Sequence, residues 1–272
     1  MEWSGWEISG SRGDSLKSNS GVFSIDQFRD EGYTEPVPLL TPEEAAAARR
    51  AFYAAIGQSE ESPGPNNDRT GGFNLRYRWA YDLATNEKVL DHVEKVLGPN
   101  IVLWATVFWY KEPHNTKYIP WHQDASYWPM EPRINLTAWI ALGPTFPENG
   151  CLRLIPGSHK DWLDDEYQPL DNDSQFSRGL SAAQVDESKA VDMSMQPGEV
   201  TFFSEATLHG SNNNGSDVAR LGFSSRFTTP EVKFDVEGLK EQNIDYLART
   251  TLVRGEDKYH YNDAIRADPP AE

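Results

Sequence analysis

The sequence predicts a mainly β protein, a sandwich or jelly roll with helices packed on the outside of one sheet. Two observations support this fold class. After about residue 100 the chain carries short runs of β-branched and aromatic residues, separated by turn clusters rich in Pro, Gly and Asn, as is typical of all-β domains. Before that point, two segments show helix signals instead. Both precede the strands, so we expect them to cover a sheet.

Length and composition favour a single domain at residues 23–272, behind a loosely ordered arm at residues 1–22 that is rich in Ser, Gly and Asn. The 272 residues are within the range of one large β-rich domain. The single cysteine excludes an intramolecular disulfide and a cysteine-based zinc site. The chain start lacks the features of a signal peptide, and no stretch is long and apolar enough to span a bilayer. We therefore predict a cytoplasmic protein.

The charge balance excludes several kinds of partner. Forty-two acidic residues against 25 basic ones give a net charge of −17. A nucleic acid or an anionic membrane is thus not expected as a partner, because Lys and Arg would have to neutralise its phosphates. For the same reason a coenzyme A or carrier-protein thioester is a less favoured substrate than a small free molecule.

The two helices have defined ends. The helix expected at residues 41–56 shows an N-cap at Thr41, Pro42 in the first turn, the capping-box partner Glu44 and a stop at Gly57. The helix expected at residues 86–97 carries valines at helical spacing and ends at a Gly-Pro pair. The residues between 58 and 72 are rich in Pro, Gly and Asn and predict an exposed loop.

The strands follow in the second part of the chain. Apolar runs suited to strands occupy residues 101–110, 135–142, 151–155, 200–204 and 221–227. The acidic stretch at about residues 160–190 lacks apolar periodicity. We interpret it as a long insertion between strands that is able to act as a lid.

Three polar residues beside these strands form a candidate metal site. His122 and Asp124 lie two apart in an extended segment, so both side chains point to one face and can bind one ion. His209 follows another strand and supplies the third ligand of a two-histidine, one-carboxylate triad, the ligand set of non-haem Fe(II) oxygenases. Arg220 lies beyond a turn-rich interval and can hold a carboxylate. Taken alone, the His122 and Asp124 pair is more readily explained as a surface dipeptide or as a buried histidine paired with a carboxylate, and Arg220 as a surface arginine.

The motifs around these residues, taken in order, resemble the phytanoyl-CoA dioxygenase family of Fe(II)- and 2-oxoglutarate-dependent oxygenases. The motifs are Trp121-His-Gln-Asp124, the run Leu136–Leu142, Glu148–Leu152, Ile155-Pro-Gly-Ser-His159 and His209-Gly-Ser211 through Arg220. The resemblance covers about residues 23–227. It implies a double-stranded β-helix, the jelly roll that cupins share.

The resemblance also implies the site. His122, Asp124 and His209 would bind iron, and Arg220 would bind the 5-carboxylate of 2-oxoglutarate in a pocket lined by Ser211, Trp139 and Thr137. Related halogenases have Ala or Gly at the position of Asp124. The aspartate of this chain therefore favours oxygen transfer over halogenation.

The implied cofactors are Fe(II), the co-substrate 2-oxoglutarate and O2. The expected reaction hydroxylates an unactivated C–H bond of a small metabolite, either amino-acid-like, zwitterionic or a natural-product intermediate, and releases succinate and CO2. It needs no catalytic acid or base. Desaturation, epoxidation and cyclisation remain open within the enzyme class. A cupin-like metal-binding protein that does not turn over 2-oxoglutarate is the alternative outside it.

Candidate substrate residues come from composition and strand parity. Aromatic residues crowd both sides of the metal motif, and arginines that share a face of an extended segment suit an anionic substrate group. The candidates are Arg78, Phe108, Tyr127, Trp128 and Arg226. The competing interpretations are that the aromatic residues pack in the core and that the arginines lie in solvent.

Overall fold

The computed structural model describes residues 21–59, 69–244 and 248–271, whose strands form two main sheets. The strands of the larger sheet are β1 (Val37–Pro38), β2 (Arg69–Gly71), β3 (Ile101–Lys111), β6 (Leu136–Ala141), β11 (Glu199–Ser204), β13 (Arg220–Thr228) and β15 (Thr251–Arg254). The strands of the smaller sheet are β4 (Ile119–His122), β7 (Arg153–Leu154), β10 (Val191–Asp192) and β12 (His209–Ser211). Two further pairs join β5 (Met130–Glu131) to β14 (Lys233–Phe234) and β8 (Gln168–Pro169) to β9 (Arg178–Gly179).

The pairing is antiparallel throughout the two main sheets. The larger sheet has the order β1-β11-β6-β13-β3-β15, with β2 also paired to β3, and the smaller has the order β10-β7-β12-β4. The sheets lie face to face, with the apolar side chains of their inner faces packed together. The prediction of a mainly β jelly roll is therefore confirmed.

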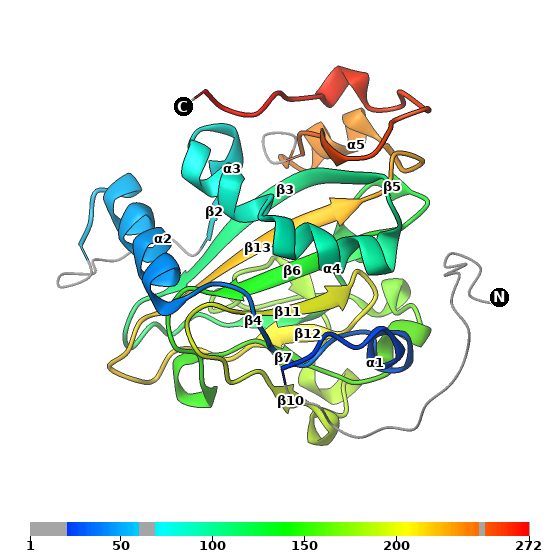
Figure 1. The fold of residues 1–272 in the computed structure, drawn as a ribbon. Coiled ribbons are helices and arrows are strands. Elements are labelled where there is room, and N and C mark those ends of the chain that lie inside the picture. The colour runs from blue at the N-terminus through cyan, green and yellow to red at the C-terminus, as the bar shows by residue number, and fades with distance from the viewer. Residues whose placement is uncertain (1–20, 60–68, 245–247, 272) are drawn as a thin grey trace.

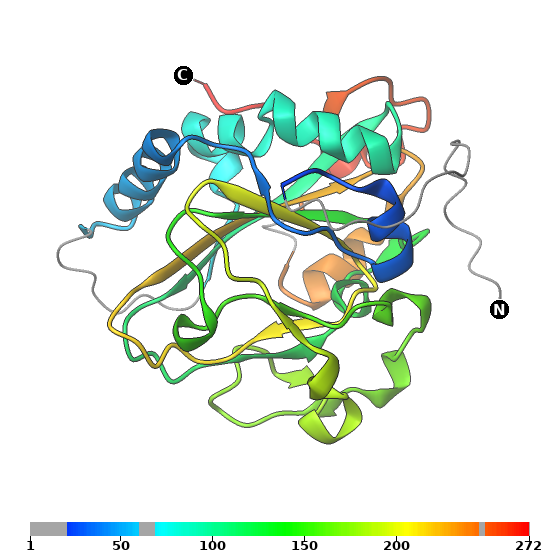
Figure 2. The ribbon, with the colours of Figure 1, turned by 60° about the horizontal axis from the view of Figure 1, so that its bottom comes forward.

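Five α-helices accompany the sheets. They are α1 (Ile25–Glu31), α2 (Pro42–Ala55), α3 (Arg78–Ala84), α4 (Glu87–Leu97) and α5 (Val236–Glu241). Helix α2 has the predicted capping box, and α4 begins after the N-cap Asn86 and ends at Gly98. In Figures 1 and 2, α2, α3 and α4 lie on the side of the larger sheet that faces away from the smaller one. Among the described residues no helix is long and apolar enough to cross a bilayer.

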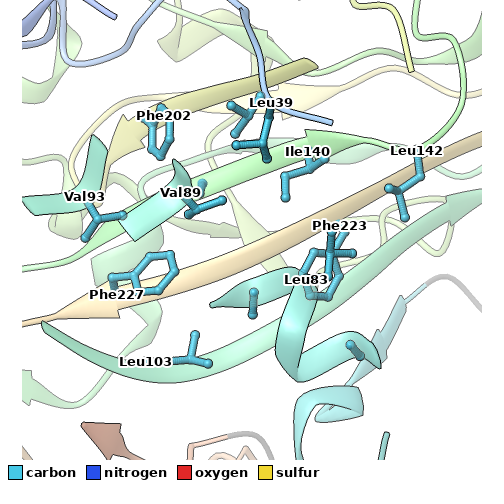
Figure 3. Close-up of a cluster of buried hydrophobic side chains, with 14 of the residues drawn as sticks. Leu39, Leu83, Val89, Val93, Leu103, Ile140, Leu142, Phe202, Phe223 and Phe227 are labelled. Carbon is cyan, nitrogen blue, oxygen red and sulfur yellow. The ribbon is translucent and has the colours of Figure 1, made fainter. Parts of the chain in front are cut away.

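The main apolar core lies between these helices and the larger sheet. Figure 3 shows Val89 and Val93 of α4 in one cluster with Ile140 and Phe227 of the larger sheet. Phe223 contacts Phe108 of the neighbouring strand, with ring centroids 4.5 Å apart. Burying each large side chain contributes about 1.5–3 kcal/mol. The helices thus stabilise the outer face of the sheet and leave its inner face for the site.

Strand β13 divides its side chains between core and site. All nine of its residues are buried. Leu221, Phe223 and Phe227 belong to the helix-side core. Arg220 and Arg226 point to the opposite face and line a pocket inside the jelly roll. This alternation follows from the period of two in a strand, as predicted for the two arginines.

Gly222, on the inner face of β13, leaves room for Trp139. A Cβ at this position would lie 2.0 Å from Trp139 Cζ2. We expect Gly222→Ala to lower the free energy of unfolding by about 1–3 kcal/mol, because the indole must leave its place. Gly143→Ala is the matched control, since its Cβ would meet no atom closer than 3.9 Å. Urea unfolding of both variants tests the expectation, which is contradicted by equal midpoints.

The structure describes the predicted lid, whereas most of the predicted arm lies outside the described residues. Residues 1–20 of the arm, and 60–68 of the predicted loop, lie outside the described residues. The insertion at about residues 160–190 is described. It carries β8, β9 and several short 3-10 helices, and in Figure 2 it lies on the far side of the smaller sheet from α2–α4. Whether it opens and closes stays a prediction.

Candidate metal centre and its two pockets

His122, Asp124 and His209 come together inside the jelly roll. One ligand atom from each lies within 4.8 Å of the others, and all three residues are buried. His122 Nε2 lies 3.6 Å from Asp124 Oδ1, and His209 Nε2 lies 3.9 Å from Asp124 Oδ2. Asp124 Oδ2 is buried and makes no hydrogen bond. An unpartnered carboxylate oxygen between two imidazoles fits a cation ligand set.

The backbone orients all three ligands. His122 ends β4 and His209 begins β12, where the two residues are directly opposed across the strand pair. Gln123 is extended (φ −106°, ψ 127°), which brings Asp124 to the same face as His122. His122 Nδ1 donates to Pro120 O at 2.8 Å and His209 Nδ1 donates to Thr207 O at 2.9 Å. Since a carbonyl only accepts, each Nε2 is left unprotonated and able to bind a metal.

The charges around Asp124 keep it ionised. Burial alone would raise the pKa of its carboxyl, but Arg226, His209 and His122 outweigh that effect and hold the pKa well below its usual range. Arg226 lies 3.6 Å from Asp124 Oδ1. Burial and the nearby His122 lower the pKa of His209 to about 3. The site therefore offers a carboxylate and a neutral imidazole at neutral pH.

An inner pocket runs from these ligands to Arg220. Its walls include Ser211, Trp139 and Thr137, the three residues that the family resemblance placed there. Arg220 is 2% exposed. Its guanidinium donates to Gly150 O (3.1 Å), Trp109 O (3.3 Å) and Ser211 Oγ (3.4 Å).

The buried charge of Arg220 lacks a protein counter-ion, because no described carboxylate forms an ion pair with it. Burial lowers the pKa of Arg220 to about 10, so it stays charged at neutral pH. Lys111, 1% exposed, is its direct cross-strand neighbour on β3. Two like charges opposed in a buried strand pair are unfavourable. An anion in the inner pocket would offset this repulsion.

Lys111 is a functional candidate that the sequence analysis missed. Its Nζ donates to Ser211 Oγ at 2.8 Å and also to Asn212 O. It therefore fixes the hydroxyl that faces Arg220. The available signal was a lysine at the end of a strand that is otherwise almost entirely apolar.

A larger outer pocket of about 710 Å³ opens on the other side of Asp124. Tyr127, Trp128 and Arg226 line it, as the sequence analysis expected. The Arg226 guanidinium lies over the Trp128 ring at 4.7 Å and so is held between an aromatic wall and Asp124. Both pockets include Trp109, Asp124 and Arg226. Asp124 thus lies where the two pockets share a wall, while His122 and His209 line the inner pocket.

The structure places Arg78 and Phe108 elsewhere, which corrects two predicted substrate residues. Arg78 was expected in an extended segment, but it begins α3 and pairs with Asp82 at 2.7 Å on the surface. Phe108 is fully buried on the helix side of β3, against Phe52 and Phe223. Neither side chain lines a described pocket of the site.

A bulge in β3 brings Trp104 into the outer pocket. Arg226 pairs with Ala105 and Phe227 pairs with Leu103, so Trp104 is the extra residue. A bulge reverses which face a side chain occupies. Trp104 thus shares the inner face with Trp109, although the two lie an odd number of residues apart.

The insertion at about residues 160–190 also supplies wall residues that the sequence analysis did not name. Gln175, Phe176, Ser177 and Arg178 line the outer pocket. The Phe176 ring lies 4.8 Å from the His122 ring. Nothing in the local sequence pattern marks these residues, because their position depends on tertiary contacts.

Gln123 connects this insertion to the metal-binding segment. Its carboxamide Nε2 donates to Asp161 O (2.6 Å) and Ala206 O (2.7 Å), while its Oε1 accepts from Leu163 N (3.0 Å). The side chain is fully buried. It therefore holds the start of the insertion and the turn before His209 in one network.

Glu205 is a second buried carboxyl near the site. It is 1% exposed, and its Oε2 accepts a hydrogen bond from Asn135 N at 3.2 Å. Its backbone carbonyl accepts one from Ala125 N at 3.1 Å. Burial raises the pKa of Glu205 to about 8. The folded protein therefore keeps this carboxyl protonated at pH values where the unfolded chain has lost the proton.

We expect metal-free protein to lose stability through Glu205 as the pH rises from about 4.5 towards 8. A group whose folded pKa is raised stabilises the fold below its unfolded pKa, and that contribution disappears as the pH approaches the folded pKa. Glu205→Gln removes the titration. The Tm of wild type relative to this variant should fall by roughly 5 °C or more over that window. A Tm difference that does not change with pH would contradict the expectation.

Comparisons with known proteins bear on the family. The sequence model of the family described as "Phytanoyl-CoA dioxygenase (PhyH)" matches residues 28–222. The peroxisomal phytanoyl-CoA dioxygenase of Bos taurus is 32% identical over 196 residues, which are 68% of this chain and 56% of that protein. A probable alpha-ketoglutarate-dependent hypophosphite dioxygenase of Stutzerimonas stutzeri is 28% identical, over 71% of this chain and 73% of that protein. The chain spans about half the length of the curated mammalian relatives it matches.

Solved structures share the fold. The non-heme monooxygenase ThoJ matches with a TM-score of 0.66 and 26% identity, over 85% of this chain and 84% of that one. CytC3, whose structure holds Fe(II) and alpha-ketoglutarate, matches with a TM-score of 0.64 over 91% of this chain and 94% of its own. At 21% identity that likeness shows the fold alone. Since mammalian relatives are named peroxisomal, the cytoplasmic location stays a prediction.

Proposed function

The chain belongs to the phytanoyl-CoA dioxygenase family, and we propose that it is an Fe(II)- and 2-oxoglutarate-dependent dioxygenase. The reaction we propose is hydroxylation of an unactivated C–H bond in a small molecule. One observation carries the proposal: three buried residues able to bind a metal line an inner pocket that ends in the buried cation Arg220, and one of them, Asp124, also lines an outer pocket with aromatic walls. The two pockets match a co-substrate and a substrate that meet at one metal ion.

Each residue has a defined task in this proposal. His122, Asp124 and His209 would hold the iron through two neutral imidazoles and a carboxylate. Arg220 would bind the 5-carboxylate of 2-oxoglutarate as a charge-assisted pair, with the Ser211 hydroxyl held in place by Lys111. Trp139 and Thr137 would wall the inner pocket against water.

Iron held by His122, Asp124 and His209, with 2-oxoglutarate and O2, would supply the oxidising chemistry, in which one oxygen atom of O2 is inserted into the C–H bond and the other enters the succinate formed with CO2 from 2-oxoglutarate. The protein binds and orients the reactants and excludes water. No side chain is required as a catalytic acid or base. Arg226 keeps Asp124 ionised and in place, from 3.6 Å away.

Two measurements test the proposal. Anaerobic protein with Fe(II) and 2-oxoglutarate should show the weak visible charge-transfer band of their complex. In air, with ascorbate and a metabolite extract, it should release succinate and yield a product that has gained one oxygen atom. A product lighter by two hydrogens would indicate desaturation or cyclisation. The band without succinate, across a broad extract, would favour a metal-binding protein without turnover, and absence of both would reject the proposal.

A further inference from the structure

The charged residues of the outer pocket favour an anionic substrate. Asp124, Arg178 and Arg226 are the charged side chains among its described lining residues. Asp124 is a metal ligand in the proposed function, and Arg226 lies beside it. The remaining charge is Arg178, which the insertion contributes. The described part of the pocket wall is therefore basic, although the chain as a whole has a net charge of −17.

Arg178 is held in place by aromatic rings. Its guanidinium lies over Tyr127 at 5.1 Å and over Tyr167 at 5.5 Å, and its Nη2 donates to Ser126 O at 2.8 Å. The Tyr127 hydroxyl donates in turn to Arg178 O at 2.5 Å. No described carboxylate lies within ion-pair distance of it, although its charge helps to lower the pKa of Asp164, and the residue is exposed. A guanidinium stacked in this way is already ordered for binding an anion, which lowers the entropy cost of binding.

Gln175, three residues earlier, is a second unexplained polar group in the wall. Both polar atoms of its carboxamide are buried and make no hydrogen bond in the described part of the chain. Leaving a buried donor and acceptor unsatisfied costs free energy. A ligand that carries polar groups next to its anion would satisfy them.

We propose that the outer pocket takes a small free organic acid, whose anionic group binds Arg178 while its flat or apolar carbon skeleton lies between Trp109, Trp128 and Phe176. This inference rests on the proposed function, because it assigns the substrate class of the same site. The lining is aromatic on several sides, and such walls suit an apolar skeleton. The local charge thus favours an acid over the zwitterionic metabolite that was one of the substrate types expected from the sequence.

The distance from Arg178 to the metal ligands favours a free acid over a coenzyme A thioester. The Tyr127 ring lies 5.7 Å from the His122 ring and 5.1 Å from the Arg178 guanidinium. One aromatic ring therefore separates the anion site from the metal site. A coenzyme A thioester carries its phosphates at the far end of the pantetheine arm from its acyl carbons. Its phosphate could not occupy Arg178 while a carbon near the thioester faced the metal.

Binding of matched probes tests this inference. A series of ω-phenylalkanoates, from phenylacetate to 6-phenylhexanoate, is titrated against wild type together with the corresponding amides and amines. Quenching of the tryptophan fluorescence is followed, to which Trp104, Trp109 and Trp128 of the pocket wall contribute. We expect at least one acid to bind roughly 10- to 100-fold more tightly than its amide, as a charge-assisted bond to Arg implies. Arg178→Gln should abolish that preference, and Arg178→Glu should transfer it to the amine.

Arg76→Gln is the matched control. Arg76 is a second arginine stacked on two rings, 4.8 Å from Phe73 and 5.8 Å from Tyr77, and it is not part of the outer pocket. It should leave the acid preference unchanged. Equal binding of acid and amide by wild type, no binding by any acid, or a preference that survives Arg178→Gln would overturn the inference. So would phenylacetyl-CoA that binds more tightly than every acid and still depends on Arg178.

The result of the probe-binding experiment can be distinguished from the result of the test of the proposed function. Formation of the iron and 2-oxoglutarate band is measured on the same samples without any probe. If the band forms and no acid is preferred, only the substrate inference fails. If acids bind through Arg178 and no band forms, only the proposed co-substrate chemistry fails.

Discussion

Arg220→Leu is expected to weaken 2-oxoglutarate binding by roughly 100-fold or more. Arg220 is buried, forms no ion pair with a described carboxylate and closes the inner pocket, so the variant removes the charge that would bind the far carboxylate. Losing one partner of a buried charge pair costs about 2–5 kcal/mol, and each 1.4 kcal/mol is about tenfold in affinity. The measurement is the dissociation constant from anaerobic titration of the Fe(II) protein with 2-oxoglutarate, followed at the visible band.

Two further variants sharpen this result. Arg78→Leu removes an arginine that pairs with Asp82 on the surface, and it should leave the affinity unchanged. Lys111→Met should weaken binding by about tenfold, because Lys111 acts through the Ser211 hydroxyl and one hydrogen bond to a charged group is worth about 1.5–3 kcal/mol. Unchanged affinity in Arg220→Leu would show that Arg220 has only a structural role and would remove the argument for 2-oxoglutarate.

Asp124→Ala is expected to abolish metal-dependent stabilisation and, with it, all turnover. The variant removes the one anionic ligand of the triad and leaves the Arg226 guanidinium facing two imidazoles. Metal affinity should fall at least about 100-fold, since loss of a partner that merely orients a ligand already costs about 10- to 100-fold. The rise in Tm on anaerobic addition of Fe(II) measures this, because a ligand stabilises the fold according to its affinity.

His114→Ala is the control for a histidine outside the site. His114 pairs with Asp217 on the surface, with side chains 65% and 96% exposed. It should keep the full metal-induced rise in Tm. If Asp124→Ala kept that rise as well, the three residues would not be the metal site, and both pockets would need another explanation.

The residues that were predicted well from the sequence lie on regular strands or in the extended segment directly after one. Asp124 shares a face with His122, and Arg226 shares one with Arg220, because a strand repeats every two residues. The capped helices were likewise predictable, since Thr41 and Asn86 carry local signals that do not depend on the rest of the fold. Local chemistry was sufficient at these positions.

The sequence did not predict the positions of side chains that depend on tertiary structure. The bulge at Trp104 changes the parity of β3, so Phe108 belongs to the core and Trp104 to the pocket. Arg78 begins a helix that carries no capping residue, so nothing in the local pattern marked it. Arg178 comes from an insertion without periodicity, and its place depends on stacking against Tyr127.

The alternation along β13 has a consequence for how the candidate site can evolve. One face of the strand holds Leu221 and Phe223 in the core, and the other presents Arg220 and Arg226 to the inner pocket. Mutation at an inward position can therefore alter specificity while the outward neighbours preserve folding. A one-residue insertion or deletion would turn the core side chains toward the pocket and the arginines toward the core. Both folding and specificity would then be lost. Selection on this strand can thus proceed by substitution, whereas changes of length are confined to loops such as the insertion that carries Arg178.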